Sequence, residues 1–305
     1  MDGVTPSETL RSAAGLDVAA RVDDLAAMLA RGRCVVLSGA GISTDSGIPD
    51  YRGPGSVPRS PMTYQEFRSG PLARQRYWAR SHLGWQRMNR ARPNEGHRAV
   101  ATLEQLELVT HTITQNVDGL HAEAGARRVT DLHGRIDQVI CLTCNQVSPR
   151  AELHTRLAGL NPGFGASLSV TTAPDGDVDL ADTSGFRVAS CAHCGGMLKP
   201  RVVFFGENVP KSTVSFCYAT VAGASSLLVL GSSLAVQSGL RFVRRAHSDG
   251  IPVAIVNRGA TRGDPLADLR IDAGCSQTLT AVLTVLSSYQ SPCNLQAEHT
   301  RCWPG

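Results

Sequence analysis

The chain has 305 residues, of which 42% are hydrophobic and 18% are charged, with a formal net charge of +4. This length accommodates one large domain, or a large domain that carries a smaller one. The arginines are scattered and no run of about five like charges occurs, which disfavours dedicated nucleic-acid binding. No stretch of about 18 apolar residues is present, so we expect no membrane contact through a spanning helix.

The beginning of the chain does not resemble a secretory leader. Residues 1–20 contain Asp2, Glu8 and Asp17, and they lack a basic segment followed by an apolar one. Of the nine cysteines, four form the two pairs described below, and the other five have no spacing typical of a disulfide framework. We therefore expect a reducing compartment, the cytoplasm.

Several short segments predict a parallel sheet. Apolar residues recur at helical spacing over residues 22–31, and short apolar runs that end at glycine or polar loops predict strands after them. Helix-length connections between the strands predict a doubly wound, Rossmann-like α/β fold. Ligands bind at the carboxyl ends of the strands in such sheets, so the loops there should meet in one crevice. The predicted strands are 34–37, 108–114, 226–230 and 253–256.

Two stretches interrupt this rhythm. Residues 54–92 are rich in arginine and aromatic residues and predict short helices, and residues 141–194 carry the paired cysteines. We expect both to form a smaller helical and zinc-binding domain. Within it, residues 163–185 lack periodicity and predict an exposed loop. The large Rossmann-like domain would then comprise residues 1–53, 93–140 and 195–287, with residues 288–305 as a disordered tail.

The paired cysteines are two Cys-x-x-Cys knuckles, Cys141/Cys144 and Cys191/Cys194. Tetrahedral zinc takes four thiolates, and this spacing lets two cysteines on one tight turn face one ion. The knuckles predict one structural zinc per chain, whose closed ligand set leaves no position for a substrate. Two redox pairs, or four thiols in the core, are the alternatives.

The first predicted strand runs into the sequence SGAG at 38–41, a turn typical of phosphate binding. The usual dinucleotide fingerprint would place a third glycine at position 44, where this chain has Thr44, and no acidic residue follows about twenty residues later at a strand end. An ordinary dehydrogenase is therefore disfavoured. By itself, the glycine-rich segment is also compatible with a structural turn.

Further sequence blocks extend this loop into a longer pattern. They are GAGISTDSGIPDYR at 39–52, TQNVDGLH at 114–121, LHG at 132–134, the two knuckles, KPRVVFFGE at 199–207, GSSL at 231–234 and VNRG at 256–259. In order and approximate spacing they resemble the sirtuins, the NAD-dependent protein lysine deacylases. The resemblance covers roughly residues 22–286 and is closest to class II sirtuins, given Tyr51, the sequence RQRYWAR at 74–80 and the long loop between the knuckles.

The resemblance implies an enzyme that uses NAD to remove the acyl group of an acyl-lysine protein or peptide, releasing nicotinamide and 2′-O-acyl-ADP-ribose. It implies His133 as the general base, a role that suits an imidazole because it titrates near neutral pH. The alternative for His133 is a structural histidine. Asn116 and Asp118 would share the catalytic pocket, and the alternative for these two residues is a capped turn after a strand. The implied cofactor residues are Gly39, Ala40, Gly41, Ser43, Ile48, Asp50, Tyr51, Arg52, Gln115, Asn116, Asp118, Gly231, Ser232, Ser233, Asn257, Arg258, Gly259 and Cys275.

The resemblance also implies that the peptide adds as a strand along residues 203–206 and 233–237, which would make sequence specificity loose. Tyr77 and Arg80 match a pattern that holds carboxylate-bearing acyl groups in another sirtuin class. Residues three apart share a helix face, and a guanidinium binds a carboxylate bidentately. The alternative is that Tyr77 packs and Arg80 is solvated. The implied substrate residues are Tyr77, Arg80, Val203, Phe204, Phe205, Gly206 and Leu234.

Two other functions remain compatible with the sequence. Protein mono-ADP-ribosyl transfer would use the same NAD pocket with a different nucleophile. A non-catalytic sensor of NAD or acyl-lysine would keep the binding residues, but it would not need His133, Asn116 and Asp118.

Overall fold

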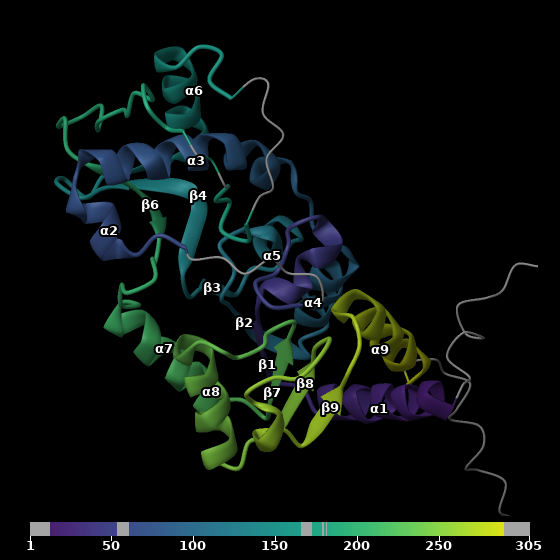
Figure 1. Ribbon diagram of the computed structural model, residues 1–305. Helices are drawn as coiled ribbons and strands as arrows, with labels where there is room; N and C mark the ends of the chain where they lie inside the picture. Colours follow the sequence, from purple (N-terminus) through teal and green to yellow (C-terminus); the bar gives the residue numbers. More distant parts are fainter. Residues whose placement is uncertain (1–12, 54–60, 166–172, 179, 181, 290–305) are drawn as a thin grey trace, which may run out of the picture.

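The structure is a computed structural model, and it describes residues 13–53, 61–165, 173–178, 180 and 182–289. It contains a six-stranded sheet and a separate three-stranded sheet. Figure 1 shows the smaller sheet and its helices lying beyond one end of the large sheet. None of the described helices has the length and apolarity that crossing a bilayer requires.

The large sheet has the strand order β3-β2-β1-β7-β8-β9, and every pair in it is parallel. The chain leaves β1 to build β2 and β3 on one side and the remaining strands on the other, so loops diverge beside β1 and leave a crevice there. The strands are β1 (Cys34–Ser38), β2 (Val109–Thr114), β3 (Val129–Asp131), β7 (Ser226–Leu230), β8 (Val253–Val256) and β9 (Leu269–Ile271). The predicted Rossmann-like sheet is confirmed, and β7 and β8 coincide with their predicted ranges.

Helices cover both faces of this sheet. Successive residues of β1 point to opposite faces: Val36 packs with α1, α4 and α9, whereas Val35 and Leu37 pack with α7 and α8. Strands buried on both faces are expected to be almost continuously apolar, and β1, β7 and β8 show this pattern in the sequence. The helices are α1 (Ala13–Ala30), α4 (Glu95–Gln105), α5 (Leu120–Glu123), α7 (Lys211–Ala222), α8 (Gln237–Ser248) and α9 (Cys275–Tyr289).

The smaller module combines an antiparallel sheet with three helices around a separate core. Its strand order is β5-β4-β6. Of the residues 141–194 that the cysteines delimit, β4 includes only Cys141, and β6 lies entirely after them. The elements are β4 (Gly134–Cys141), β5 (Val147–Pro149), β6 (Leu198–Val202), α2 (Tyr64–Ser69), α3 (Pro71–Arg90) and α6 (Arg150–Leu160).

The expectation that residues 54–92 form short helices is wrong for α3, which is one helix of 20 residues. Gly70 separates it from α2, and Pro71 begins it; proline suits a first helical turn because its missing N–H needs no partner there. Trp78, Trp85 and Met88 are buried on one side of α3. Tertiary burial therefore sustains a helix that the arginine-rich sequence does not show clearly.

The expectation of an exposed loop over residues 163–185 is also wrong for part of that segment. In the described stretch 173–178, Ala173 and Val178 are buried. This stretch packs so closely on α3 that a Cβ at Gly84 would collide with the carbonyl oxygen of Gly176. The predicted disordered tail lies mostly outside the described residues, and α9 extends to Tyr289.

Candidate active site

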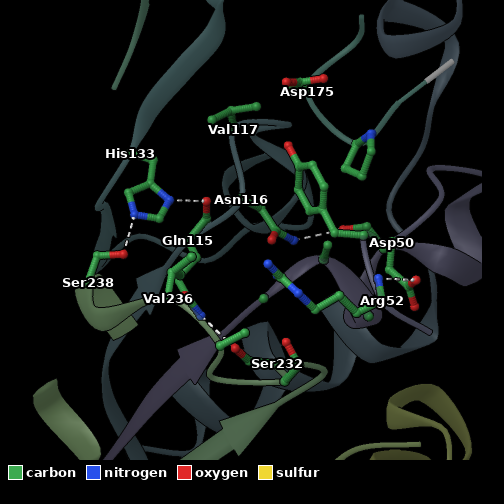
Figure 2. Close-up of a pocket in the computed structure, with 18 of the residues that line it drawn as sticks. Asp50, Arg52, Gln115, Asn116, Val117, His133, Asp175, Ser232, Val236 and Ser238 are labelled. Atoms are coloured by element: carbon green, nitrogen blue, oxygen red, sulfur yellow. Dashed lines mark hydrogen bonds between the residues drawn. The ribbon is translucent and has the colours of Figure 1, made fainter. Parts of the chain in front are cut away.

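A cavity of about 530 Å³ lies at the carboxyl ends of the central strands of the large sheet, with the small module on its other side. The loops after β1, β2, β7 and β8 all contribute to its wall, so the predicted convergence of these loops is confirmed. Figure 2 shows labelled side chains from the loops after β1, β2 and β7 around one space.

Glycines allow two of these loops to touch through their backbones. A Cβ on Gly41 would lie 2.9 Å from both the Cα and the carbonyl oxygen of Gly231, and a Cβ on Gly39 would lie 2.8 Å from Cβ of Ser232. Gly231 also has φ 58°, in the left-handed region that glycine adopts without strain. The glycines of the two motifs therefore bring the ends of β1 and β7 together.

Side chains continue this connection. Nε2 of Gln115, after β2, donates a 2.8 Å hydrogen bond to the hydroxyl of Ser232, after β7. Leu234, which is buried in the cavity wall, has φ 54°, and this conformation is strained for a residue with a branched side chain. Such strain persists only when surrounding contacts fix the backbone, so this loop is held in a specific shape.

His133 is positioned as a neutral base. Its Nδ1 lies 2.8 Å from the carbonyl oxygen of Gln115, which only accepts, so Nδ1 carries the proton and donates. Its Nε2 therefore has the lone pair, and the Ser238 hydroxyl, 2.9 Å away, donates to it (Figure 2). Burial is the largest influence and lowers the pKa of His133, although the Gln115 carbonyl acts in the opposite direction. At neutral pH the imidazole can accept a proton at Nε2.

Ser43 connects the other two predicted catalytic residues. Its hydroxyl donates to Oδ2 of Asp118 at 2.7 Å and accepts from Nδ2 of Asn116 at 3.0 Å. Ser43 is fully buried and both partners line the cavity, so one hydroxyl fixes the amide and the carboxylate relative to each other.

Two buried histidines, His97 and His121, contact the serines that lie next to this site. Nε2 of His97 lies 3.4 Å from the Ser43 hydroxyl, and Nε2 of His121 lies 2.8 Å from the hydroxyl of Ser38. The two rings are 4.9 Å apart at their centroids. Burial lowers the pKa of His97 to about 4 and also lowers that of His121, so both are neutral at pH 7.

The small module supplies an aromatic wall. Tyr77 packs against Phe204 with 5.2 Å between ring centroids, and Tyr51 approaches Phe205 edge-on at 6.3 Å. Phe205 also forms a bridge with Thr63, which joins the end of the small sheet to the start of α2. Tyr77, Phe204 and Phe205 were predicted as substrate residues, and all three line the cavity.

Arg80 does not line the cavity. Its Nη2 forms a 2.6 Å ion pair with Oδ2 of Asp177, and its Nε donates to the carbonyl oxygen of Val178 at 2.6 Å. The structure therefore gives no support to a direct role for Arg80 in binding an acyl carboxylate. It is also not the solvated side chain of the alternative, because only 19% of it is exposed.

The structure brings together all the other predicted cofactor and substrate residues except Cys275. Cys275 begins α9 and is buried, with its thiol directed to the carbonyl oxygen of Val256 at 3.7 Å. Sequence reasoning missed several residues of the wall, which include Asp175, Asp177, Ser238 and Glu207. Ser238 follows the matched GSSL block and was within reach of sequence reasoning, whereas the two aspartates lie in a stretch without any pattern.

The four knuckle cysteines meet in the small module. Their sulfur atoms all lie within 4.8 Å of one another, with Cys141 and Cys194 at 3.5 Å and Cys144 and Cys191 at 3.9 Å. Four converging thiols fit a closed structural zinc site. Cys141 ends β4 and Cys144 follows it, whereas Cys191 and Cys194 precede β6. Because Cys141 pairs with Leu198, the first residue of β6, the ion would tie together the two turns at one end of the module's sheet.

Comparison with known proteins identifies the family. The Sir2 family model matches residues 39–238. An NAD-dependent protein deacetylase 1 from Mycobacterium avium is 54% identical over 87% of this chain and 95% of its own length, and one from Streptomyces coelicolor is 57% identical over 90% and 94%. A solved Sir2 structure with a p53 peptide and NAD+ is 30% identical, with a TM-score of 0.70 over 88% of this chain and 99% of that one. With the parallel sheet, the glycine-lined cavity and the four thiols in place, this chain belongs to the Sir2 family of sirtuins.

Proposed function

We propose that this protein is an NAD-dependent protein lysine deacylase. Bound NAD would supply the ADP-ribose that accepts the acyl group, with release of nicotinamide. The curated relatives are deacetylases, and a solved neighbour, Sir2Tm, was bound to a propionylated peptide. The single observation that carries the proposal is the state of His133, a neutral imidazole in the cavity wall whose Nε2 lone pair accepts from Ser238, a hydroxyl in the same wall.

The walls of the cavity suggest how its two substrates divide the space. The loop of Gly39, Ala40 and Gly41 would lie beside the phosphates of NAD, because it ends a central strand and has no large side chain that blocks approach. The N–H groups of Gly39 and Gly41 themselves donate to the carbonyl oxygens of Leu230 and Gly231, so they hold the loop in shape. Arg258 would lie near the adenosine. The amide of Asn116 and the carboxylate of Asp118, fixed by Ser43, offer one donor and one acceptor to a nicotinamide carboxamide.

In this arrangement His133 would take a proton at Nε2 from a ribose hydroxyl, and the Gln115 carbonyl would stabilise the resulting imidazolium through Nδ1. The aromatic wall around Tyr77 and Phe204 would hold the apolar stem of the acyl-lysine and exclude water. Peptide backbone beside residues 203–206 and 233–236 would add hydrogen bonds without reading many side chains.

The closed thiol set assigns the zinc a structural role in this proposal. We further propose the division into a large NAD-binding domain and a smaller zinc-containing domain. All seven cysteines of the described residues are free thiols, which supports a reducing compartment such as the cytoplasm.

The experiment is an assay of acetyl-lysine peptide with NAD, in which mass spectrometry follows both the peptide and a protein acceptor. Loss of the acyl group together with nicotinamide release would support deacylation. Gain of ADP-ribose on protein without acyl loss would replace the proposal with mono-ADP-ribosyl transfer. Binding of NAD and peptide with no nicotinamide release would indicate the sensor.

A further inference from the structure

Two carboxylates from outside the sirtuin motifs line the cavity. Asp175 and Asp177 belong to the stretch 173–178, between α6 and the second knuckle, and both are in its wall. Nothing in the spacing of the matched sequence blocks accounts for them. Their position beside Arg80 bears on the acyl group that the site accepts.

The carboxylates lie at the peptide end of the cavity. Both carboxylates raise the pKa of Tyr77, and both also raise the pKa of Tyr51, so they are close to the aromatic wall. Burial first, and then the charge of Asp175, raises the pKa of Tyr51 well above its usual range. Figure 2 shows Asp175 at the end of the cavity away from Ser232, which marks the loop after β7.

The stretch is fixed to the module by specific contacts. Val178 is fully buried, and its carbonyl oxygen accepts from Arg80. Gly84 has no side chain, which leaves room for Gly176 directly against α3. A turn at Gly176, with φ 77°, then directs the two aspartates toward the cavity. The carboxylates therefore form part of a packed wall.

The positive charge of Arg80 is paired with a carboxylate of this wall. Asp177 binds its Nη2 at 2.6 Å, and Asp175 also lies within its electrostatic reach. Glu207, another acidic residue that lines the cavity, is paired with Lys199 at 2.9 Å. Among the described residues that line the cavity, the arginines are Arg52 and Arg258, which belong to the loops of the large sheet. An acyl group at the peptide end therefore meets carboxylates and a guanidinium that is already bound.

We propose that Asp177, assisted by Asp175, sets the acyl preference of this enzyme by binding Arg80, so that the site accepts uncharged acyl groups and rejects those that end in a carboxylate. This inference rests on the proposed deacylase function. A terminal carboxylate would have to displace Asp177 from Arg80, and it would lie close to like charges. An acetyl group or another uncharged acyl group meets neither obstacle.

The test compares one peptide carrying either acetyl-lysine or glutaryl-lysine and measures the ratio of their kcat/KM values. Wild type should favour acetyl. Asp177→Asn should raise the glutaryl-to-acetyl ratio by roughly ten- to a hundredfold. Without the charge of Asp177, the guanidinium of Arg80 can form charge-assisted hydrogen bonds with the carboxylate of the glutaryl group. Asp177→Asn combined with Arg80→Met should return the ratio toward that of wild type.

Arg80→Met alone should leave the ratio near that of wild type, since Arg80 is occupied there. Asp175→Asn should raise the ratio less than Asp177→Asn, and it provides a second variant if Asp177→Asn fails to fold. Asp182→Asn is the matched control, an exposed aspartate in the same region that bonds to Ser184 and does not line the cavity. Zinc content and thermal unfolding identify variants that are folded.

A wild-type enzyme that favours glutaryl would overturn the inference, as would a folded Asp177→Asn variant with an unchanged ratio. Failure of the proposed function looks different, because wild type would then remove neither acyl group in the presence of NAD. In that case the ratio of kcat/KM values is replaced by the ratio of the binding affinities of the two labelled peptides, measured by fluorescence anisotropy. Equal affinities in wild type would again overturn the inference, and tighter binding of the acetyl peptide that reverses in Asp177→Asn would support it.

Discussion

The two walls of the cavity are built by different means. The wall from the large sheet consists of short strand-end loops that touch through glycine backbones, as Gly41 and Gly231 do, and through hydrogen bonds such as that from Gln115 to Ser232. The wall from the small module consists of large side chains whose positions depend on aromatic packing, an ion pair and four converging thiols. The first wall thus depends on glycines, whose missing Cβ atoms let two backbones touch. The second wall depends on contacts between large side chains and on a metal site.

The cores beneath the two walls differ in the same sense. The large sheet is buried between two apolar cores. The small module contains Arg150, fully buried, with its guanidinium 5.3 Å from the ring centroids of both Trp78 and Trp85. No carboxylate among the described residues pairs with this guanidinium, so cation–π contacts compensate part of its desolvation. We therefore expect the small module to be the less stable half.

Removal of the metal should give the largest difference in stability between the small module and the large sheet. Structural zinc contributes about 10 to 16 kcal/mol of apparent binding energy coupled to folding, which is comparable to or larger than the total stability of a domain. Cys141→Ser should therefore lose zinc and unfold the small module. Hydrogen exchange is expected to show lost protection in β4 and β6 with protection kept in β1 and β7. Equal loss in both sheets would mean that the two regions fold as one unit, and active wild type without zinc would refute the site.

His133→Ala tests the large-sheet wall without disturbing either core. Losing a general base typically lowers turnover by about 10²- to 10⁴-fold. We expect a fall of this size in steady-state deacylation, with NAD affinity and the melting temperature nearly unchanged. His247→Ala, at the exposed end of α8, is the matched control and should retain activity. Turnover of His133→Ala within a few-fold of wild type would remove His133 from the mechanism.

Acid should weaken the large domain through its buried histidines. Burial lowers the pKa of folded His97 from 6.5 to about 4, so the unfolded chain takes up this proton first. The contribution of His97 is complete above pH 6.5 and declines as the pH falls toward 4, by on the order of 3 kcal/mol. Urea unfolding across this range measures the decline. His97→Gln should lower stability at neutral pH and flatten the slope, and an unchanged slope would contradict the assignment.

Two glycine substitutions give the smallest effects, and they should have opposite signs. Gly41→Ala places a methyl group 2.9 Å from the Gly231 backbone, and overpacking of this kind costs about 1 to 3 kcal/mol. Gly159→Ala, on the exposed side of α6 with no atom within 4 Å, should stabilise by about 0.5 to 1 kcal/mol. Chemical denaturation measures both, and titration with NAD should show weaker binding only for Gly41→Ala. Equal effects of the two would mean that the glycine contact does not shape the loop.

Much of the large-sheet wall was predictable because each of its parts is a short continuous motif. An apolar run followed by glycine or polar residues marks a strand end, and parallel strands bring such ends to one edge. Cys275 was an exception: the block resemblance placed it at the cofactor, but α9 buries its thiol against Val256. A motif match does not show which way a side chain points.

The wall of the small module was less predictable because its elements interrupt any single period. The 20-residue helix α3 was expected as short helices, since its arginines obscure the buried face formed by Trp78 and Trp85. The stretch 173–178 was expected to be exposed because it shows neither helical nor strand periodicity. Its burial depends on Gly84, far away in the chain, and no local pattern records that contact.

The sequence by itself determined the apolar strands, the glycine loop after β1, the two cysteine knuckles and the resemblance to sirtuins, because each strand, loop, knuckle and sequence block consists of residues close together in the chain. Only the tertiary structure decided which distant side chains meet. Ser238 reaches His133 from 105 positions away, and Val178 binds Arg80 from 98 positions away. Pairings of this kind depend on how helices and sheets pack, and local propensity carries no information about them. For this reason the residues that would catalyse could be predicted from motifs, whereas the partner that occupies Arg80 could not.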